Sequence, residues 1–170
     1  MNADAGAAVS DDDALAALYL AHFSSLVRLA AVLLDDVAAC EDIAQEAYVR
    51  VAQARGRLRD PDAALAYLRT TVVNLSRSAL RRRMVAGKYG FRVSRPDAEG
   101  DATSAVVDRD AMLSALRKLP RRPREAVALR YYSDLTEAQT AEVMGVRVGS
   151  VKAYTSRGLA LLAEQLEVTR

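Results

Sequence analysis

Hydrophobic residues recur at three- and four-residue steps along most of the chain, which is the spacing of one face of an α-helix. The first such pattern runs from about Asp13 to Leu34, and a second follows Asp36, whose carboxylate is suited to cap a helix. A third begins at Asp60-Pro61, a cap followed by a proline at the first helical position, where its missing N–H is not needed. The positions predicted to point inward are Leu15, Leu18, Tyr19, Leu26, Leu29 and Leu33, then Val37, Cys40, Ala44, Ala47, Tyr48 and Val51, then Leu65, Leu68, Val72, Leu75 and Ala79. We therefore expect a bundle of helices.

The periodic pattern stops between about Val85 and Val106, where glycine, serine and proline accompany charged residues and predict a linker. Helical periodicity resumes at Asp108, stops at Pro120 and restarts at Pro123 for a short helix. The predicted fold class is all-α, with two small helical domains joined by a flexible linker. The predicted organisation is a disordered acidic start over residues 1–12, a first domain over 13–84, the linker over 85–107 and a second domain over 108–168.

The second domain carries the pattern of a helix-turn-helix. Thr136 and Gln139 are spaced as a capping box, which predicts a short helix that ends at Gly145. A further helix is expected from about Val148 or Gly149, although no good capping residue precedes it. Its predicted inward residues are Val151, Leu159 and Leu162, and its predicted outward residues are Lys152, Ser156 and Arg157. Cations for phosphates and short polar or basic groups for base edges suit a helix that enters the major groove of DNA.

Charge changes this picture through its placement. The formal net charge is only +2, which by itself does not indicate a nucleic-acid partner. Basic residues nevertheless gather in two clusters, one at Arg81, Arg82 and Arg83 and one at Arg117, Lys118, Arg121, Arg122 and Arg124. A solvated face is the simpler reading of either cluster alone. The second cluster flanks the helix-turn-helix and strengthens the DNA-binding prediction.

The remaining candidate chemistry is sparse. The single histidine, His22, and the single cysteine, Cys40, stand in no recognisable catalytic or ligand spacing, which argues against an enzyme and against a metal or other cofactor. Cys40 is expected to be buried and inert, as suits a reducing compartment. Apolar stretches such as Leu29 to Leu34 are far shorter than a bilayer span, so no membrane insertion is expected.

Several motifs together resemble the extracytoplasmic-function group of the sigma-70 family of RNA polymerase sigma factors. Asp42-Ile43-Ala44-Gln45-Glu46-Ala47-Tyr48 resembles the region-two core motif, and residues 66–77 resemble the promoter-melting helix. Leu119-Pro120-Arg121-Arg122-Pro123-Arg124-Glu125, followed by Leu129-Arg130-Tyr131-Tyr132 and the helix-turn-helix, resembles region four. The resemblance implies a transcription initiation factor that binds core RNA polymerase and directs it to promoters. Its partners are then the clamp helices of the largest polymerase subunit, the flap of the second subunit, promoter DNA and an anti-sigma protein.

The resemblance also assigns residues to three surfaces. Those implied to dock on core polymerase are Asp42, Gln45, Glu46 and Val49, which helical spacing independently places on one face. Those implied to contact the minus-ten element are Arg55, Arg57, Tyr67, Thr70, Asn74, Arg77 and Arg81. Those implied to contact the minus-thirty-five element are Arg147, Ser150, Lys152, Ala153, Ser156 and Arg157. Tyr67 stands where the family more often has tryptophan, and Gly158 where alanine is commoner.

Two alternatives stay open on sequence grounds. A helix-turn-helix regulator that binds operators would share the second domain but would have a receiver or ligand-sensing first domain. In the linker, Asp97, Glu99 and Asp101 fit either a mimic of RNA in the polymerase exit path or a solvated tether. The resemblance implies a cytoplasmic protein, associated with the nucleoid when active, and a membrane-bound anti-sigma factor is one form of control that relatives use.

Overall fold

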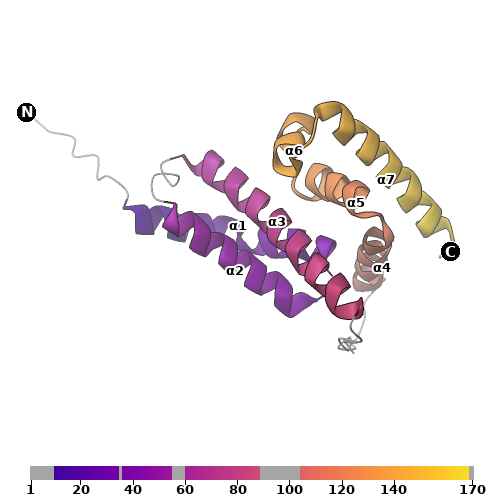
Figure 1. The fold of residues 1–170 in the computed structure, drawn as a ribbon, viewed down its shortest axis with the longest axis horizontal. Helices are drawn as coiled ribbons and strands as arrows, with labels where there is room; N and C mark the ends of the chain where they lie inside the picture. Colours follow the sequence, from indigo (N-terminus) through magenta and orange to yellow (C-terminus); the bar gives the residue numbers. More distant parts are fainter. Residues whose placement is uncertain (1–9, 35, 55–59, 89–103, 169–170) are drawn as a thin grey trace, which may run out of the picture.

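The computed structural model describes residues 10–34, 36–54, 60–88 and 104–168, and these residues form helices and connecting turns, with no strand among them. The helices are α1 (Asp11–Leu33), α2 (Val37–Gln53), α3 (Pro61–Lys88), α4 (Ser104–Lys118), α5 (Arg121–Val127), the π-helix η2 (Ala128–Tyr132), α6 (Glu137–Met144) and α7 (Val148–Val168). Helices α1 to α3 form one bundle, and α4 to α7 form a second group that lies against it (Figure 1). The predicted all-α fold is confirmed.

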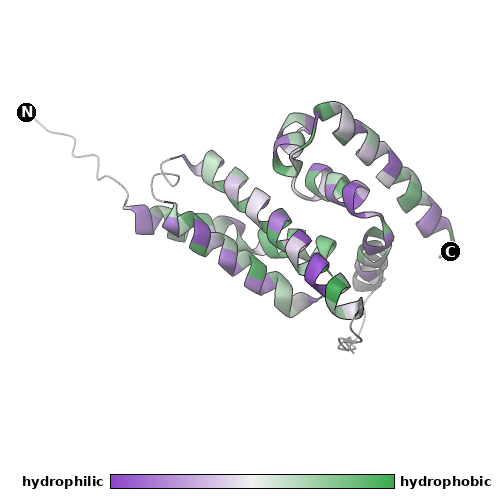
Figure 2. Cartoon of the chain, in the orientation of Figure 1, coloured by the Kyte–Doolittle hydropathy of each residue, from purple (hydrophilic) through white to green (hydrophobic). Residues whose placement is uncertain are grey.

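The first bundle is held together by the faces that the periodicity predicted, although Tyr19, predicted to point inward, is exposed. Leu26, Leu29, Val51, Leu68 and Val72 are almost fully buried where α1, α2 and α3 meet. Hydrophobic and hydrophilic residues alternate around each of these helices, as the surface of a bundle requires (Figure 2). The inward face of α3 is wider than predicted: Thr71, Val73 and Ser76 are buried as well, because α3 packs on α1 and α2 and also on α6.

Two helix starts in this bundle depend on side-chain caps. Asp36 Oδ1 accepts a hydrogen bond from the N–H of Ala39 at 3.2 Å, and Asp60 Oδ1 accepts from the N–H of Asp62 at 3.0 Å. At the amino end, however, α1 begins at Asp11 and not near Asp13, because Ser10 Oγ accepts from the N–H of Asp13. Acidic side chains in a first helical turn interact favourably with the helix dipole. The predicted disordered start therefore extends too far.

Helical structure also extends into both ends of the predicted linker. Helix α3 continues to Lys88, and α4 already begins at Ser104. None of the residues Met84, Val85 and Ala86 is a glycine or a proline, so no local signal ends the helix there. Helix α5 likewise begins at Arg121, two residues before the predicted start, because Pro123 still lies in its first turn, where no backbone donor is needed.

The helix-turn-helix has the predicted form. Thr136 and Gln139 make both hydrogen bonds of the capping box, and Gly145 ends α6 with a left-handed backbone at φ 67°. Helix α7 begins at Val148 and buries Val151 as expected. Leu159, predicted to point inward, is instead exposed, and Gly158 takes the buried position. A Cβ atom on Gly158 would lie 2.6 Å from Val127 Cγ2 and 3.0 Å from Pro123 O, so the missing side chain lets α7 approach α5 closely.

One helix departs from the expectation about membrane spans. By length and composition, α1 is apolar enough to cross a bilayer, with a mean hydropathy of 1.6 over its best window. The expectation of no membrane insertion considered only short uninterrupted apolar runs, whereas this window averages the hydropathy of a longer stretch of α1, polar residues included. In the structure, Leu18, Leu26 and Leu29 of α1 are buried in the bundle with α2 and α3. A core helix passes the same test, so this feature is weak evidence for a span.

Candidate functional site

The first candidate surface, called here the α2 face, consists of Asp42, Gln45, Glu46 and Val49. All four side chains are exposed, while the intervening Ile43, Ala44 and Ala47 are buried against the bundle. Glu46 Oε1 accepts a hydrogen bond from Arg50 Nε at 2.9 Å, and both side chains remain about half exposed. An exposed ion pair of this kind contributes little to stability, so a partner can displace Arg50. The α2 face is thus an exposed acidic and polar surface on a helix whose opposite side is buried.

Tyr48, the aromatic residue of the same motif, points into the bundle. Tyr48 is buried, and its hydroxyl donates to the carbonyl of Leu18 at 3.0 Å. Its ring lies beside those of Tyr19 and Phe23, with ring centroids 5.1 and 6.1 Å away. Burial, with a smaller contribution from Tyr19, raises the pKa of Tyr48 from 10.0 to about 12. Tyr48 therefore fixes α2 to α1 and leaves the α2 face to its neighbours.

The second candidate surface, called here the α3 stripe, consists of Thr70, Asn74, Arg77 and Arg81. Asn74 and Arg81 are exposed, whereas Thr70 is half-buried and its hydroxyl donates to the carbonyl of Ala66 at 3.0 Å. Tyr67, from the same predicted site, lies one turn before and is also half-buried. Arg55 and Arg57 lie outside the described residues.

Arg77, also in the α3 stripe, contacts a carboxylate of the second helical group, which the sequence did not predict. Its guanidinium donates from Nε to Glu125 Oε1 at 2.8 Å and from Nη2 to Glu125 Oε2 at 2.7 Å. The side chain of Arg77 is 15% exposed and that of Glu125 is 2% exposed. Arg122 lies 3.4 Å from the same carboxylate. Arg77 was predicted to face DNA. In the structure it faces the second helical group and contacts Glu125.

The second basic cluster also lies differently from the expectation. Arg117 donates from Nε and Nη2 to the carbonyl of Ala31, at 3.1 and 2.9 Å, and Arg124 donates to the carbonyl of Leu33 at 3.2 Å. These carbonyls belong to the last turn of α1, where carbonyl groups lack partners within the helix and where no residue is basic. Four of the five cluster residues, Arg117, Arg121, Arg122 and Arg124, therefore make contacts within the chain, because carbonyls and a carboxylate of packed helices need donors.

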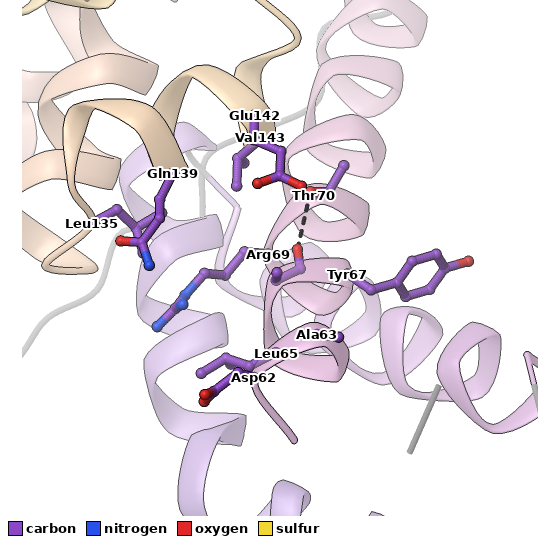
Figure 3. A pocket seen from close by; sticks show the side chains of 11 residues that line it. Asp62, Ala63, Leu65, Tyr67, Arg69, Thr70, Leu135, Gln139, Glu142 and Val143 are labelled. Carbon is purple, nitrogen blue, oxygen red and sulfur yellow. Dashed lines mark hydrogen bonds between the residues drawn. The ribbon is translucent and has the colours of Figure 1, made fainter. Parts of the chain in front are cut away.

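A cleft of about 620 Å³ opens where α3 meets α6. Arg69 and Thr70 line one side of it, and Gln139 and Glu142 the other, while Tyr67 points away from Arg69 (Figure 3). Burial lowers the pKa of Arg69, and the nearby Asp62 acts in the opposite direction; an arginine nonetheless stays charged at neutral pH. Of the α3 stripe, only Thr70 lines this cleft, whereas Arg77 donates from Nη2 to the carbonyl of Met144 at the end of α6, at 3.4 Å.

The third candidate surface, called here the α7 face, consists of Lys152, Ala153, Ser156 and Arg157. All four are exposed on one side of α7, opposite the buried Val151 and Gly158. The ammonium of Lys152 lies 3.7 Å from Glu137 Oε2 at the start of α6. Of the two flanking residues, Arg147 is exposed and Ser150 is half-buried, within the first turn and not at the cap. Nothing in the described helices covers this basic and polar face.

Sequence reasoning missed Glu125 as a central residue. Its one available signal was its position, one helical turn after Arg121 and Arg122, which places a carboxylate among cations. Nothing in the pattern indicates that a third cation comes from α3.

Family models match both helical groups. The Sigma-70 region 2 model matches residues 18–85, and the Sigma-70 region 4 model matches residues 109–162. The ECF RNA polymerase sigma factor SigL of Mycobacterium tuberculosis is 32% identical over 97% of this chain and 97% of its own length. The chain belongs to the extracytoplasmic-function group of RNA polymerase sigma factors. As a sigma factor it acts in transcription initiation, with RNA polymerase and promoter DNA as partners.

Solved sigma factors have the same fold. The sigma factor RpoE of Bartonella quintana, in complex with the anti-sigma factor NepR, superposes with a TM-score of 0.69 at 24% identity and covers 89% of this chain and 96% of its own. CnrH, in complex with the cytosolic domain of CnrY, also gives 0.69, at 23% identity over 92% and 89% of the two chains. The match to region 2 excludes a receiver or ligand-sensing first domain, so the alternative of an operator-binding regulator is set aside.

Proposed function

We propose that this sigma factor docks on core RNA polymerase through the α2 face, contacts the minus-ten element through the α3 stripe, Tyr67 and the loop that precedes α3, and contacts the minus-thirty-five element through the α7 face with Arg147 and Ser150. The observation that supports the proposal is that α2 and α7 each have one buried side and one exposed side. In α2 and α7, the buried side chains hold the helix in place, and the motif residues on the opposite side are exposed.

Polymerase docking is supported by the chemistry of the α2 face. Asp42 and Glu46 bring two carboxylates, Gln45 an amide and Val49 an apolar contact, all on a helix that buries Ala44 and Ala47. A rigid helical surface loses little conformational entropy on binding, which favours a stable complex. A partner surface with cations would pair with the carboxylates and release Glu46 from Arg50.

Promoter contact is divided between two domains, each with its own cations. The α7 face offers Lys152 and Arg157 for phosphates or guanine edges and Ser156 for a further base edge. Residues 85–107 were predicted as a flexible linker; the part of that range outside both helices would join the two contacts. Joining them raises the effective concentration of the second contact once the first is made, so modest individual affinities add up to promoter selection.

The assignment to the sigma factors also leads us to propose how the protein is controlled and how it acts. The solved relatives RpoE and CnrH were captured with NepR and with the cytosolic domain of CnrY, and a partner of that anti-sigma class is proposed for this chain. The protein acts by binding and positioning, with the chemistry performed by the polymerase. Because that polymerase is cytoplasmic, so is the proposed site of action, with an anti-sigma factor held at the membrane as one form of sequestration.

The docking assignment is tested by changing the α2 face without disturbing the bundle. The variant Asp42→Ala with Glu46→Lys alters two exposed side chains, and its circular dichroism should match that of the parent. We expect loss of binding to purified core polymerase in a pull-down or in fluorescence anisotropy. The matched control is Glu164→Lys, the same charge reversal on an exposed position of α7. Unchanged core binding by the double variant would contradict the docking assignment.

A further inference from the structure

The cleft between α3 and α6 contains a cation that lacks a partner within the described part of the chain. Arg69 lines the cleft and is half-buried, yet its guanidinium makes no hydrogen bond or ion pair with any residue that the structure describes. Burial lowers its pKa, and the charge of nearby Asp62 opposes this effect only in part. Arginine side chains are rarely withdrawn from water unless an anion compensates them. An anion bound in the cleft would supply this compensation.

Gln139 of α6 adds further donors to the same end of the cleft. Its Oε1 accepts a hydrogen bond from the N–H of Thr136 at 2.9 Å, so the amide is held in place and its two N–H donors stay available. In Figure 3 the amide nitrogen of Gln139 and the guanidinium of Arg69 point to the same end of the cleft. Guanidinium and amide N–H groups together suit a carboxylate, which accepts through two oxygens.

The rest of the cleft is acidic. The carboxylate of Glu142 lies at the other end in Figure 3, is exposed, and has no hydrogen bond or ion pair with a described residue. Asp62 is a second carboxylate in the lining, so two negative charges stand against the one positive charge of Arg69. These carboxylates would repel a polyanion such as a nucleotide, whereas an ammonium group would pair with Glu142. The charges therefore favour a zwitterion.

Apolar side chains complete the lining. Leu135 and Val143 are buried and Leu65 is half-buried beside them. The volume of about 620 Å³ lies within the range of about 300–1,000 Å³ that is usual for small-molecule sites, and such sites often occur where two domains meet. The cleft thus has room for a ligand with an apolar body between its charged groups.

We propose that this cleft binds a small zwitterion of the amino-acid or short-peptide class, with its carboxylate on Arg69 and Gln139, its ammonium on Glu142 and an apolar side chain against Leu135 and Val143. The ligand would contact the region 2 domain and the region 4 domain at once, so its binding would favour the arrangement in which α3 and α6 face one another. Arg69, Gln139 and Glu142 belong to none of the three candidate surfaces. The inference therefore does not depend on the proposed function.

Isothermal titration calorimetry on the full chain tests the ligand class. The probes are L-leucine and L-leucyl-L-leucine, two zwitterions that differ in the separation of their charges. The matched analogues are isocaproate, which is leucine without the ammonium, and isoamylamine, which is leucine without the carboxylate. We expect at least one zwitterion to bind. Each analogue should bind more weakly by about tenfold or more, as for the loss of one charge-assisted hydrogen bond.

Two variants test the location of the site. Arg69→Gln and Glu142→Gln each remove one charge from the cleft and should each weaken the zwitterion by about tenfold. Arg69→Gln should not lower the melting temperature of the ligand-free protein, because the guanidinium has no partner among the described residues. The matched controls are Arg28→Gln and Glu164→Gln, the same changes at exposed positions of α1 and α7, and they should leave binding unchanged.

Each contrary result removes a defined part of the proposal. Absence of binding by both zwitterions at millimolar concentration would overturn the site itself. Isocaproate that binds as tightly as the zwitterions would overturn the pairing with Glu142, and isoamylamine that does so would overturn the pairing with Arg69. Affinity that is unchanged in both variants would place the ligand outside the cleft. If Arg69→Gln lowers the melting temperature and keeps full affinity, Arg69 is a structural residue and the proposal fails.

Discussion

Arg77 of α3 and Glu125 of α5 form a two-point ion pair, with Nε–Oε1 and Nη2–Oε2 distances of 2.8 and 2.7 Å, across the boundary between the region 2 and region 4 domains. Both side chains are largely withdrawn from water. The pair joins α3 to α5, and Arg122 and Arg121 lie 3.4 and 4.0 Å from the same carboxylate, so Glu125 is surrounded by three cations.

This pair should be measurable in a double-mutant cycle. Arg77→Ala, Glu125→Ala and the double variant, unfolded in urea and followed by circular dichroism, should give a coupling free energy of about 1–3 kcal/mol. The exposed pair Glu46–Arg50 is the matched control and should couple by only about 0.3–0.5 kcal/mol. Additive effects of the two alanine substitutions would show that the ion pair does not form in solution.

Gly158→Ala should destabilise the region 4 domain although alanine favours a helix. The helix propensity gained is about 1 kcal/mol, but the new Cβ would meet Val127 Cγ2 at 2.6 Å and Pro123 O at 3.0 Å. Overpacking in a core costs about 1–3 kcal/mol, and the backbone oxygen cannot move aside as a side chain can. We expect a lower melting temperature by calorimetry. Gly149→Ala, where a Cβ meets nothing within 4 Å, should not lower it.

Tyr48 should make stability fall in alkali. Its folded pKa of about 12 lies above the ordinary 10.0, so the folded state favours the protonated phenol. The contribution is complete below pH 10 and is lost as the pH rises from 10 through 12, and its full size is about 2–3 kcal/mol. Urea denaturation between pH 8 and 11 should show a shallower decline for Tyr48→Phe. Tyr131→Phe, an exposed tyrosine, should keep the steep decline of the parent.

Arg157 should contribute to upstream promoter contact. It is exposed on the α7 face beside Ser156, where the helix-turn-helix geometry directs side chains to the major groove. Once a promoter is known, Arg157→Ala should weaken binding of its upstream duplex by about 1–3 kcal/mol if it reads a base. Fluorescence anisotropy measures this, with Arg28→Ala as the control for lost charge. An unchanged affinity would remove Arg157 from the site.

The parts that sequence predicted are those governed by neighbours along the chain. The capping box of Thr136 and Gln139, the left-handed Gly145 and the caps Asp36 and Asp60 depend on residues two to four positions away, so the pattern contains the whole interaction. The exposure of Asp42, Gln45 and Glu46 followed in the same way from helical period. The π-helix at Ala128–Tyr132 had no such signal, and the extra residue in that turn was not predicted.

The parts that sequence missed depend on residues distant along the chain. Arg77 and Arg117 read as solvated or DNA-facing cations, because a pattern records that a side chain is charged and not which carboxylate or carbonyl reaches it. The burial of Gly158 instead of Leu159 depends likewise on how closely α5 and α7 approach, a distance set by Pro123 and Val127. Tertiary packing decided these positions.

Run-off transcription with purified core RNA polymerase and a library of genomic promoter fragments tests most directly whether the chain selects promoters. With this protein added, core polymerase should initiate at a small, reproducible set of start sites, and the Asp42→Ala, Glu46→Lys variant should abolish them. Transcripts no different from those of core polymerase alone would contradict the account.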